Sequence, residues 1–138
     1  MTLSIVDIPR PMSYPPRRTR FTRHFWDRLS SGRFETTKCS ACGRFSFPPK
    51  PFCPHCWSQK VVWTPLSGRG KIYSRTVVHA AAAVFSEEVP LSVCIVDLDE
   101  GVRLATRLVD GATLQLDDPV QLLILRFSDG CLYGAAPA

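Results

Sequence analysis

The chain has 138 residues and a mass of 15.4 kDa, and 45% of its residues are hydrophobic, which allows a modest core in one or two small modules. The longest wholly apolar runs, 80–85 and 122–125, are far shorter than the roughly 20 residues that span a bilayer, which excludes a transmembrane helix. Residues 1–71 hold 13 Lys and Arg against 3 Asp and Glu, a balance of +10, whereas residues 72–138 hold 4 against 9, a balance of −5. The basic half suits an anionic ligand or a partner surface, although such charge also serves solubility alone.

The first 18 residues contain four prolines and no apolar period, which predicts an extended arm over 1–18, of a kind that commonly becomes ordered on a partner. A helical segment is expected over 19–32, with Gly32 as its end. Its apolar residues share one side of the helix: Phe21, Phe25, Trp26 and Leu29. Arginines crowd its start, where they could meet phosphates: Arg17, Arg18, Arg20 and Arg23.

Four cysteines follow at the spacing Cys39-x2-Cys42-x10-Cys53-x2-Cys56. Two C-x-x-C knuckles separated by a short loop bring four thiolates to one ion, and this spacing is typical of a structural zinc site. Three prolines in the spacer favour an extended loop between the knuckles rather than a helix. The sequence therefore predicts a zinc ribbon over 33–66, with the four cysteines as ligands of one zinc ion.

Two disulfides and a rubredoxin-like iron site are the alternatives to zinc. Disulfides need an oxidising compartment, but residues 1–20 contain no apolar signal-peptide run, so we expect a cytoplasmic protein. Iron remains open, because four thiolates bind both metals. His55 lies inside the second knuckle, but we do not expect it to be a ligand, since four cysteines already complete a tetrahedral shell.

From residue 67 onward the pattern changes to short runs with strand character, separated by Asp- and Gly-rich turns. We expect five strands, over 71–79, 91–97, 102–109, 120–127 and 131–136. Cys94 and Cys131 fall inside these strands, where a free cysteine usually acts as a small buried apolar residue. Five short strands with such turns predict an OB-fold barrel over 67–138. The fold class is therefore mainly β, with an N-terminal helix, a zinc ribbon and a C-terminal barrel.

Several motifs occur in a fixed order within residues 20–136: Cys39-Ser40-Ala41-Cys42-Gly43, Phe47-Pro48-Pro49, Cys53-Pro54-His55-Cys56, Ser67-Gly68-Arg69-Gly70, Val77-Val78-His79 and Val96-Asp97-Leu98-Asp99-Glu100-Gly101. This ordered set resembles the acyl-CoA-associated proteins that join a rubredoxin-like zinc ribbon to an OB-fold and accompany thiolases. The knuckles alone are shared with many ribbons, whereas the complete set is specific.

The resemblance implies a small non-catalytic subunit of a hetero-oligomer, bound to a thiolase-fold enzyme or to a hotdog-fold hydratase, that helps to shape the site for acyl-CoA. The chemistry, carbon–carbon bond cleavage or formation or acyl transfer on CoA esters, would then belong to the partner in a thiolase, aldolase or acyltransferase complex. The chain contains no nucleophile elbow, P-loop or dinucleotide-binding glycine motif, and we assign no catalytic residue.

CoA carries a pyrophosphate, a ribose phosphate and an adenine ring, groups that arginines, backbone amides and aromatic faces bind. The candidate CoA contacts are Arg20, Arg23, Arg69 and Lys71, with Phe47 and Trp57 as candidate stacking platforms. The competing interpretation is single-stranded nucleic-acid binding, since OB-folds and zinc ribbons both bind single strands and a basic half would follow phosphates. Against it, the expected strands 91–97 and 102–109 contain no aromatic residue on which bases could stack.

Two positions depart from the family pattern. Trp57 stands where a glycine usually follows the fourth cysteine, and a bulky residue in a left-handed turn costs about 1–2 kcal/mol, so we expect an altered second knuckle. The segment 110–118 is too short for the helix that is common between the third and fourth strands of OB-folds, so we expect a barrel that is partly open there.

Overall fold

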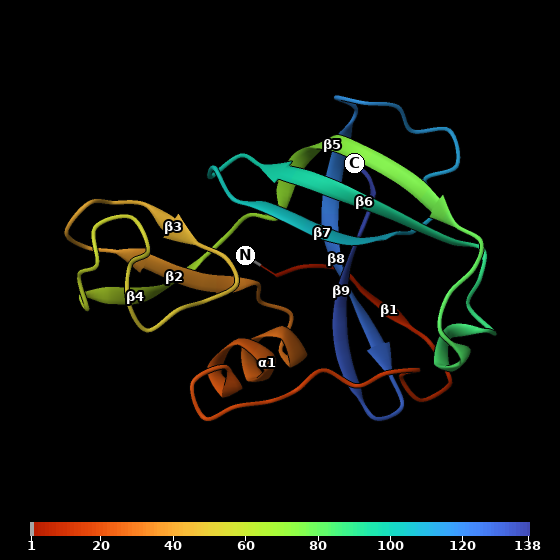
Figure 1. The fold of residues 1–138 in the computed structure, drawn as a ribbon, viewed down its shortest axis with the longest axis horizontal. Coiled ribbons are helices and arrows are strands. Elements are labelled where there is room, and N and C mark those ends of the chain that lie inside the picture. The colour runs from red at the N-terminus through yellow and green to blue at the C-terminus, as the bar shows by residue number, and fades with distance from the viewer. Residues whose placement is uncertain (1) are drawn as a thin grey trace.

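The computed structural model describes residues 2–138, which form a small sheet, a barrel and one α-helix (Figure 1). The elements are β1 Ile5–Asp7, α1 Arg23–Ser30, β2 Glu35–Cys39, β3 Phe45–Ser46, β4 Val61–Pro65, β5 Arg69–Val78, the 3₁₀-helix η1 Ala83–Phe85, β6 Leu91–Leu98, β7 Arg103–Leu108, β8 Pro119–Phe127 and β9 Gly130–Pro137. The mainly β class with one α-helix is confirmed. No helix within 2–138 is long and apolar enough to cross a membrane.

The small sheet has the order β3-β2-β4, and both of its strand pairs are antiparallel. Thr37, in the middle of β2, pairs with Ser46 on one side and with Trp63 on the other. The threonines of β2 are fully buried, as expected of β-branched residues in a central strand. The knuckles stand at the ends of these strands, so the sheet fixes where the cysteines lie.

The barrel is closed through the strand order β8-β5-β6-β7-β9-β8. The five strands predicted from the sequence are all present, with ends shifted by at most two residues. Alternation along β6 places Cys94, Val96 and Leu98 in the core, as a barrel requires. Cys131 is also buried, so both cysteines outside the knuckles act as small core residues.

The expectation of a partly open barrel is wrong. Segment 110–118 contains no helix, as expected, but closure does not depend on it, because β7 pairs in parallel with β9 through Arg107↔Gly134 and Leu108↔Ala135. The segment is also tied to β5: the Arg75 guanidinium donates to the carbonyls of Gly111 and Leu114 at 2.5 and 2.6 Å.

The N-terminal segment lies against the barrel. Three of its residues form β1, which pairs in parallel with the second half of β8. Leu3 and Met12 are buried, and the Met12 amide donates to the Asp129 carboxylate at 2.9 Å. The arm therefore contributes to the core, because its few apolar residues cover β8.

Helix α1 packs between the small sheet and the barrel, with contacts to β2, β8 and β9 (Figure 1). It is shorter than the predicted segment, because reciprocal hydrogen bonds between Thr19 and Thr22 make a turn before it. Phe25 and Leu29 are buried, which confirms the predicted apolar side. Gly32, with a φ of 91°, ends the helical segment, as its left-handed conformation favours glycine.

Candidate metal centre and neighbouring surfaces

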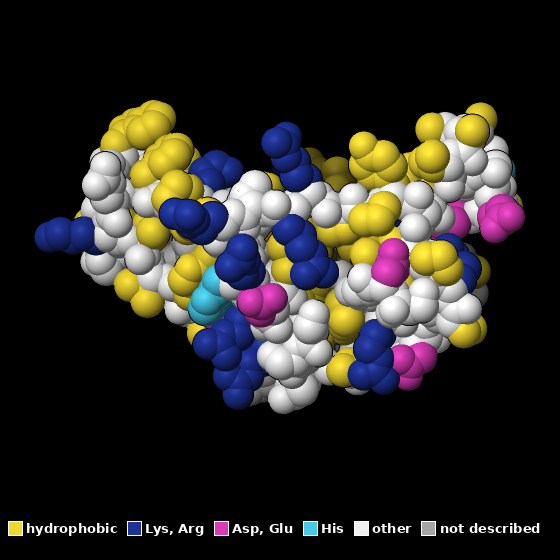
Figure 2. Space-filling model, turned by 90° about the horizontal axis from the view of Figure 1, so that it is seen from below, with side chains coloured by type: hydrophobic (Ala, Val, Ile, Leu, Met, Phe, Trp, Pro, Cys, Tyr) yellow, Lys and Arg dark blue, Asp and Glu magenta, His cyan; other side chains and the backbone are white. Residues whose placement is uncertain are grey.

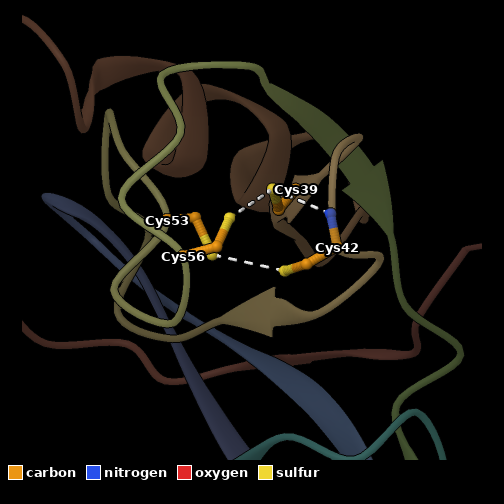
Figure 3. Close-up of side chains that lie close together, drawn as sticks. All are labelled: Cys39, Cys42, Cys53 and Cys56. Carbon is orange, nitrogen blue, oxygen red and sulfur yellow. Dashed lines mark hydrogen bonds between the residues drawn. The ribbon is translucent and has the colours of Figure 1, made fainter.

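The two knuckles form matching loops that face each other (Figure 3). In the first, the Gly43 amide donates to the Cys39 carbonyl at 2.9 Å; in the second, the Trp57 amide donates to the Cys53 carbonyl at 2.8 Å. Trp57 has a φ of 65°, so the left-handed conformation is present. The expectation that Trp57 alters the second knuckle is wrong, because its indole projects outward and stacks on Phe52 at 5.5 Å between ring centroids.

The four thiols form a cluster of the size that one metal ion needs. All four Sγ atoms lie within 4.8 Å of one another, and the Cys39–Cys56 and Cys42–Cys53 pairs are 3.6 Å apart. Tetrahedral zinc with bonds of about 2.3 Å would place its sulfurs about 3.8 Å apart, so the cluster fits the ion after small adjustments. The exposed His55 is not part of this cluster, which agrees with the expected all-cysteine set.

Backbone amides prepare this cluster to hold negative charge. The Cys42 amide donates to Cys39 Sγ at 3.4 Å and lowers the pKa of the Cys39 thiol to about 6. Burial raises the pKa of Cys53, but the amides of Cys56 and His55 outweigh it and leave that pKa lowered. The Ser58 amide favours the Cys56 thiolate, yet the neighbouring thiols and burial together raise the pKa of Cys56 to about 11. Adjacent thiolates repel each other, so full ionisation requires a cation among them.

The four candidate CoA contacts lie in two separate pairs. Arg20 and Arg23 are exposed at the start of α1. Arg69 and Lys71 project from β5, where they form long, exposed ion pairs with Asp99 at 3.7 Å and with Asp117 at 3.9 Å. Within 2–138, no hydrogen bond or ion pair joins one pair to the other.

The two candidate stacking residues differ in how exposed they are. Phe47 is half-buried among aromatic rings of α1 and β9, whereas 73% of Trp57 is exposed.

Arg69 lines a cavity of about 440 Å³ between the N-terminal segment, the β4–β5 connection and β8. The other residues that line it are Thr2, Leu3, Ser4, Ser67 and Gln121. The close approach of these segments needs Gly68: a Cβ atom there would stand 2.7 Å from the Gln121 amide nitrogen, at a φ of 78° that favours glycine. The Ser67-Gly68-Arg69-Gly70 motif thus places a guanidinium beside hydroxyl and amide groups.

Sequence reasoning missed a hydrogen-bonded contact under α1. His24 Nε2 lies 2.8 Å from the buried Glu35 carboxylate, and the imidazole stacks on Trp63 at 4.3 Å between ring centroids. The cluster joins α1 to both β2 and β4. No local signal in the sequence could have identified it, because the three residues come together only when the helix docks on the small sheet.

Comparison with known proteins agrees with the two-part architecture. Residues 26–62 match the family model described as "ChsH2, rubredoxin-like zinc ribbon domain", and residues 63–124 match that described as "ChsH2, C-terminal OB-fold domain". One chain of the solved structure of the "Ltp2-ChsH2(DUF35) aldolase" superposes with a TM-score of 0.78 and 31% identity. That match covers 89% of the present chain and 98% of the other.

Two curated relatives are similar in sequence. A "DUF35 domain-containing scaffold protein" of Methanocaldococcus jannaschii is 36% identical over 53% of this chain and 52% of its own length. The "Benzoylsuccinyl-CoA thiolase subunit BbsA" of Thauera aromatica is 35% identical over 63% of this chain and 60% of its own length. The match therefore spans only about half to three fifths of these relatives.

Proposed function

Because this chain belongs to the ChsH2-type (DUF35) family, which joins a rubredoxin-like zinc ribbon to an OB-fold, we propose that it is a non-catalytic subunit of an enzyme complex that acts on acyl-CoA thioesters. The observation that carries the proposal is the continuous match of ribbon and barrel, in one order, to 98% of a chain from an aldolase assembly. The name of the Thauera relative as a thiolase subunit favours a thiolase-fold enzyme as the partner, and a hotdog-fold hydratase is the second choice.

The metal in this proposal is one structural zinc ion held by Cys39, Cys42, Cys53 and Cys56. The donor set supports a structural role for the ion, because four thiolates in a closed tetrahedral shell leave no coordination position for a substrate. The ion would crosslink the knuckles and fix the β2–β4 sheet. The residues of this chain would then position surfaces, while bond cleavage or formation takes place on the partner.

For acyl-CoA, the site around Arg69 is the better supported of the two candidate pairs. Its guanidinium, the nearby hydroxyls and Gln121 match the hydrogen-bonding groups of a phosphate or ribose. Lys71 lies two residues further along β5 on the same side of the strand, and its ion pair with Asp117 is long and exposed, so it costs little to break.

The proposal is tested by isolating a tagged chain from its native cells, identifying its companions by mass spectrometry and recording the absorbance of the eluate at 260 nm. A thiolase-fold or hydratase-fold enzyme recovered in a fixed ratio is the expected result. Recovery of nucleic acid without such an enzyme would overturn the proposal.

Single-stranded nucleic-acid binding is the second candidate, and one observation favours it. The arginines at 17, 18, 20 and 23 are all exposed, and none of them forms an ion pair within 2–138. Strands β6 and β7, however, carry no aromatic residue for base stacking.

A further inference from the structure

An apolar pocket of about 190 Å³ opens where α1, the proline-rich spacer of the ribbon and β9 meet. Phe25, Trp26, Phe47 and Tyr133 line it together with the Pro48-Pro49 pair. Arg17, from the segment that leads into α1, is its one charged lining residue. The pocket lies outside the cysteine cluster and the Arg69 cavity, and neither the metal nor the CoA proposal uses it.

The walls of this pocket are preformed. Phe25, Phe47 and Tyr133 pack against one another with centroid distances of 5.9, 6.1 and 6.0 Å, and Phe25 is only 3% exposed. Burial raises the pKa of Tyr133, so its phenol stays protonated at neutral pH. The rings come from the helix, the ribbon and the barrel, so the pocket is formed only where these three parts of the chain pack together.

The surface around the pocket carries uncompensated positive charge. Seen from the side on which α1 lies in Figure 1, Lys and Arg side chains gather over the helix (Figure 2). From residue 8 to residue 34, Asp27 is the single acidic residue in the sequence. Arg17, Arg18, Arg20 and Arg23 are exposed and have no carboxylate partner among residues 2–138. Such charge attracts an acidic segment and raises its association rate.

We infer that this pocket accepts an aromatic side chain of the partner enzyme, in a segment whose flanking carboxylates pair with the arginines at the start of α1. The inference rests on the proposed function, because it names a contact of the same subunit with its enzyme. A pocket of about 190 Å³ has room for an aromatic ring of benzene size. Buried aromatic anchors surrounded by charged contacts commonly dominate binding energy at protein interfaces.

Charge alone would also suit a nucleic acid, but the pocket favours a peptide. Tyr133 packs edge to face against Phe25 and Phe47, and these rings line a small pocket. Single strands instead need a row of exposed aromatic faces beside the phosphate track. The acidic barrel half would repel a strand that extended beyond the helix.

The test titrates the full chain with the fluorescent-labelled peptide acetyl-Glu-Asp-Phe-Asp-Glu-amide, with its Phe-to-Ala counterpart and with a labelled oligothymidine. Fluorescence anisotropy gives the affinities, and NMR shifts of the amides of Trp26, Phe47 and Tyr133 locate the site. The Phe peptide should bind at least tenfold more tightly than the Ala peptide and shift these amides. Arg17→Glu should weaken the Phe peptide at least fivefold, whereas the matched exposed variant Arg44→Glu should change its affinity less than twofold.

Equal affinity for the two peptides, or an unchanged affinity in Arg17→Glu, would overturn the inference. Oligothymidine that binds more tightly than the Phe peptide and shifts the same amides would overturn it in favour of nucleic acid.

The same Arg17→Glu and Arg44→Glu chains are then used in the native pull-down. An enzyme that co-purifies equally with both sinks the inference but leaves the proposed function standing. Absence of any such enzyme with the wild-type chain defeats the proposed function, while the peptide titration still decides the pocket's specificity.

Discussion

Trp57 occupies in the second knuckle the backbone position that Gly43 occupies in the first. Their φ angles are 65° and 79°, and the amide of each donates to the carbonyl of the first cysteine in its knuckle. The two turns of the cysteine cluster thus have similar backbone conformations, although one of them carries a tryptophan side chain. The strain is tolerated because the indole lies on the surface, where it stacks on Phe52.

Substitutions at Trp57 that increase backbone strain should weaken metal retention, and those that relieve it should not. Trp57→Val puts a β-branched residue at a positive φ and should weaken the folded ribbon by about 1–2 kcal/mol, so that a chelator removes the metal at lower concentration. Trp57→Gly should retain the metal at least as well as the wild type, because glycine favours this conformation. Chelator titrations followed by metal analysis give the order. A valine variant that matches the glycine variant would show that this turn carries no strain.

Purified protein should contain one zinc ion per chain, and Cys42→Ser should abolish stable binding. Loss of one thiolate opens the tetrahedral shell and leaves the knuckles uncrosslinked, so the ribbon should unfold before the barrel. Cys94→Ala is the matched control: this cysteine is buried in β6, and its loss should leave the zinc content unchanged. Elemental analysis is the measurement, and iron in place of zinc would refute the assignment of the metal.

Acid should weaken the contact between the N-terminal segment, the β5–β6 connection and β7. Glu88, whose side chain is only 4% exposed, accepts hydrogen bonds from Arg107 at 2.6 Å and from Arg10 at 3.1 Å. Burial raises the pKa of Glu88, but these arginines and Ser13 outweigh it and lower that pKa from 4.5 to about 2. The Glu88 carboxylate therefore binds a proton less readily in the folded state than in the unfolded state. Its stabilisation is complete above pH 4.5 and is lost as the pH falls toward 2.

Glu88→Gln should lower the free energy of unfolding by about 1–3 kcal/mol at pH 7, because two guanidinium groups lose their charged acceptor. The same variant should show a smaller loss of stability between pH 4.5 and pH 2. Denaturant unfolding at a series of pH values measures both effects, with the exposed Glu87→Gln as the neighbouring control. If the variant lost as much unfolding free energy between pH 4.5 and pH 2 as the wild type does, the role of Glu88 would be contradicted.

The Arg69→Ala/Lys71→Ala double variant should weaken acyl-CoA binding to the assembled complex about tenfold, through the loss of charge-assisted hydrogen bonds to phosphate. Both side chains are exposed and make only long ion pairs, so the thermal midpoint of the chain should hardly change. Arg20→Ala/Arg23→Ala is the comparison from the other candidate pair. Calorimetry with acyl-CoA decides between them, and an unchanged Kd in the β5 variant would move the CoA contact away from Arg69.

Sequence patterns were enough to locate the knuckles and the five barrel strands. Both signals are local: a metal knuckle is built from four consecutive residues, and strand alternation repeats every two residues. The apolar side of the helix was predicted in the same way, from Phe21, Phe25, Trp26 and Leu29 at helical spacing, and Phe25 and Leu29 are buried in the structure. The sequence identifies CoA contacts less specifically, because no local pattern distinguishes a ligand-binding arginine or lysine from any other surface arginine or lysine.

Only the tertiary structure decided how these pieces close on one another. The pairing of Arg107 with Gly134 closes the barrel, and Ile5 pairs with Ile124 across most of the chain. The pocket beside Arg17 and the burial of Glu88 between two arginines depend on the same closure. By itself, the sequence determined the two cysteine knuckles, the strands and the division of charge, since neighbouring residues specify these. Contacts between distant segments are selected by packing of the whole core, so they became visible only in the folded chain.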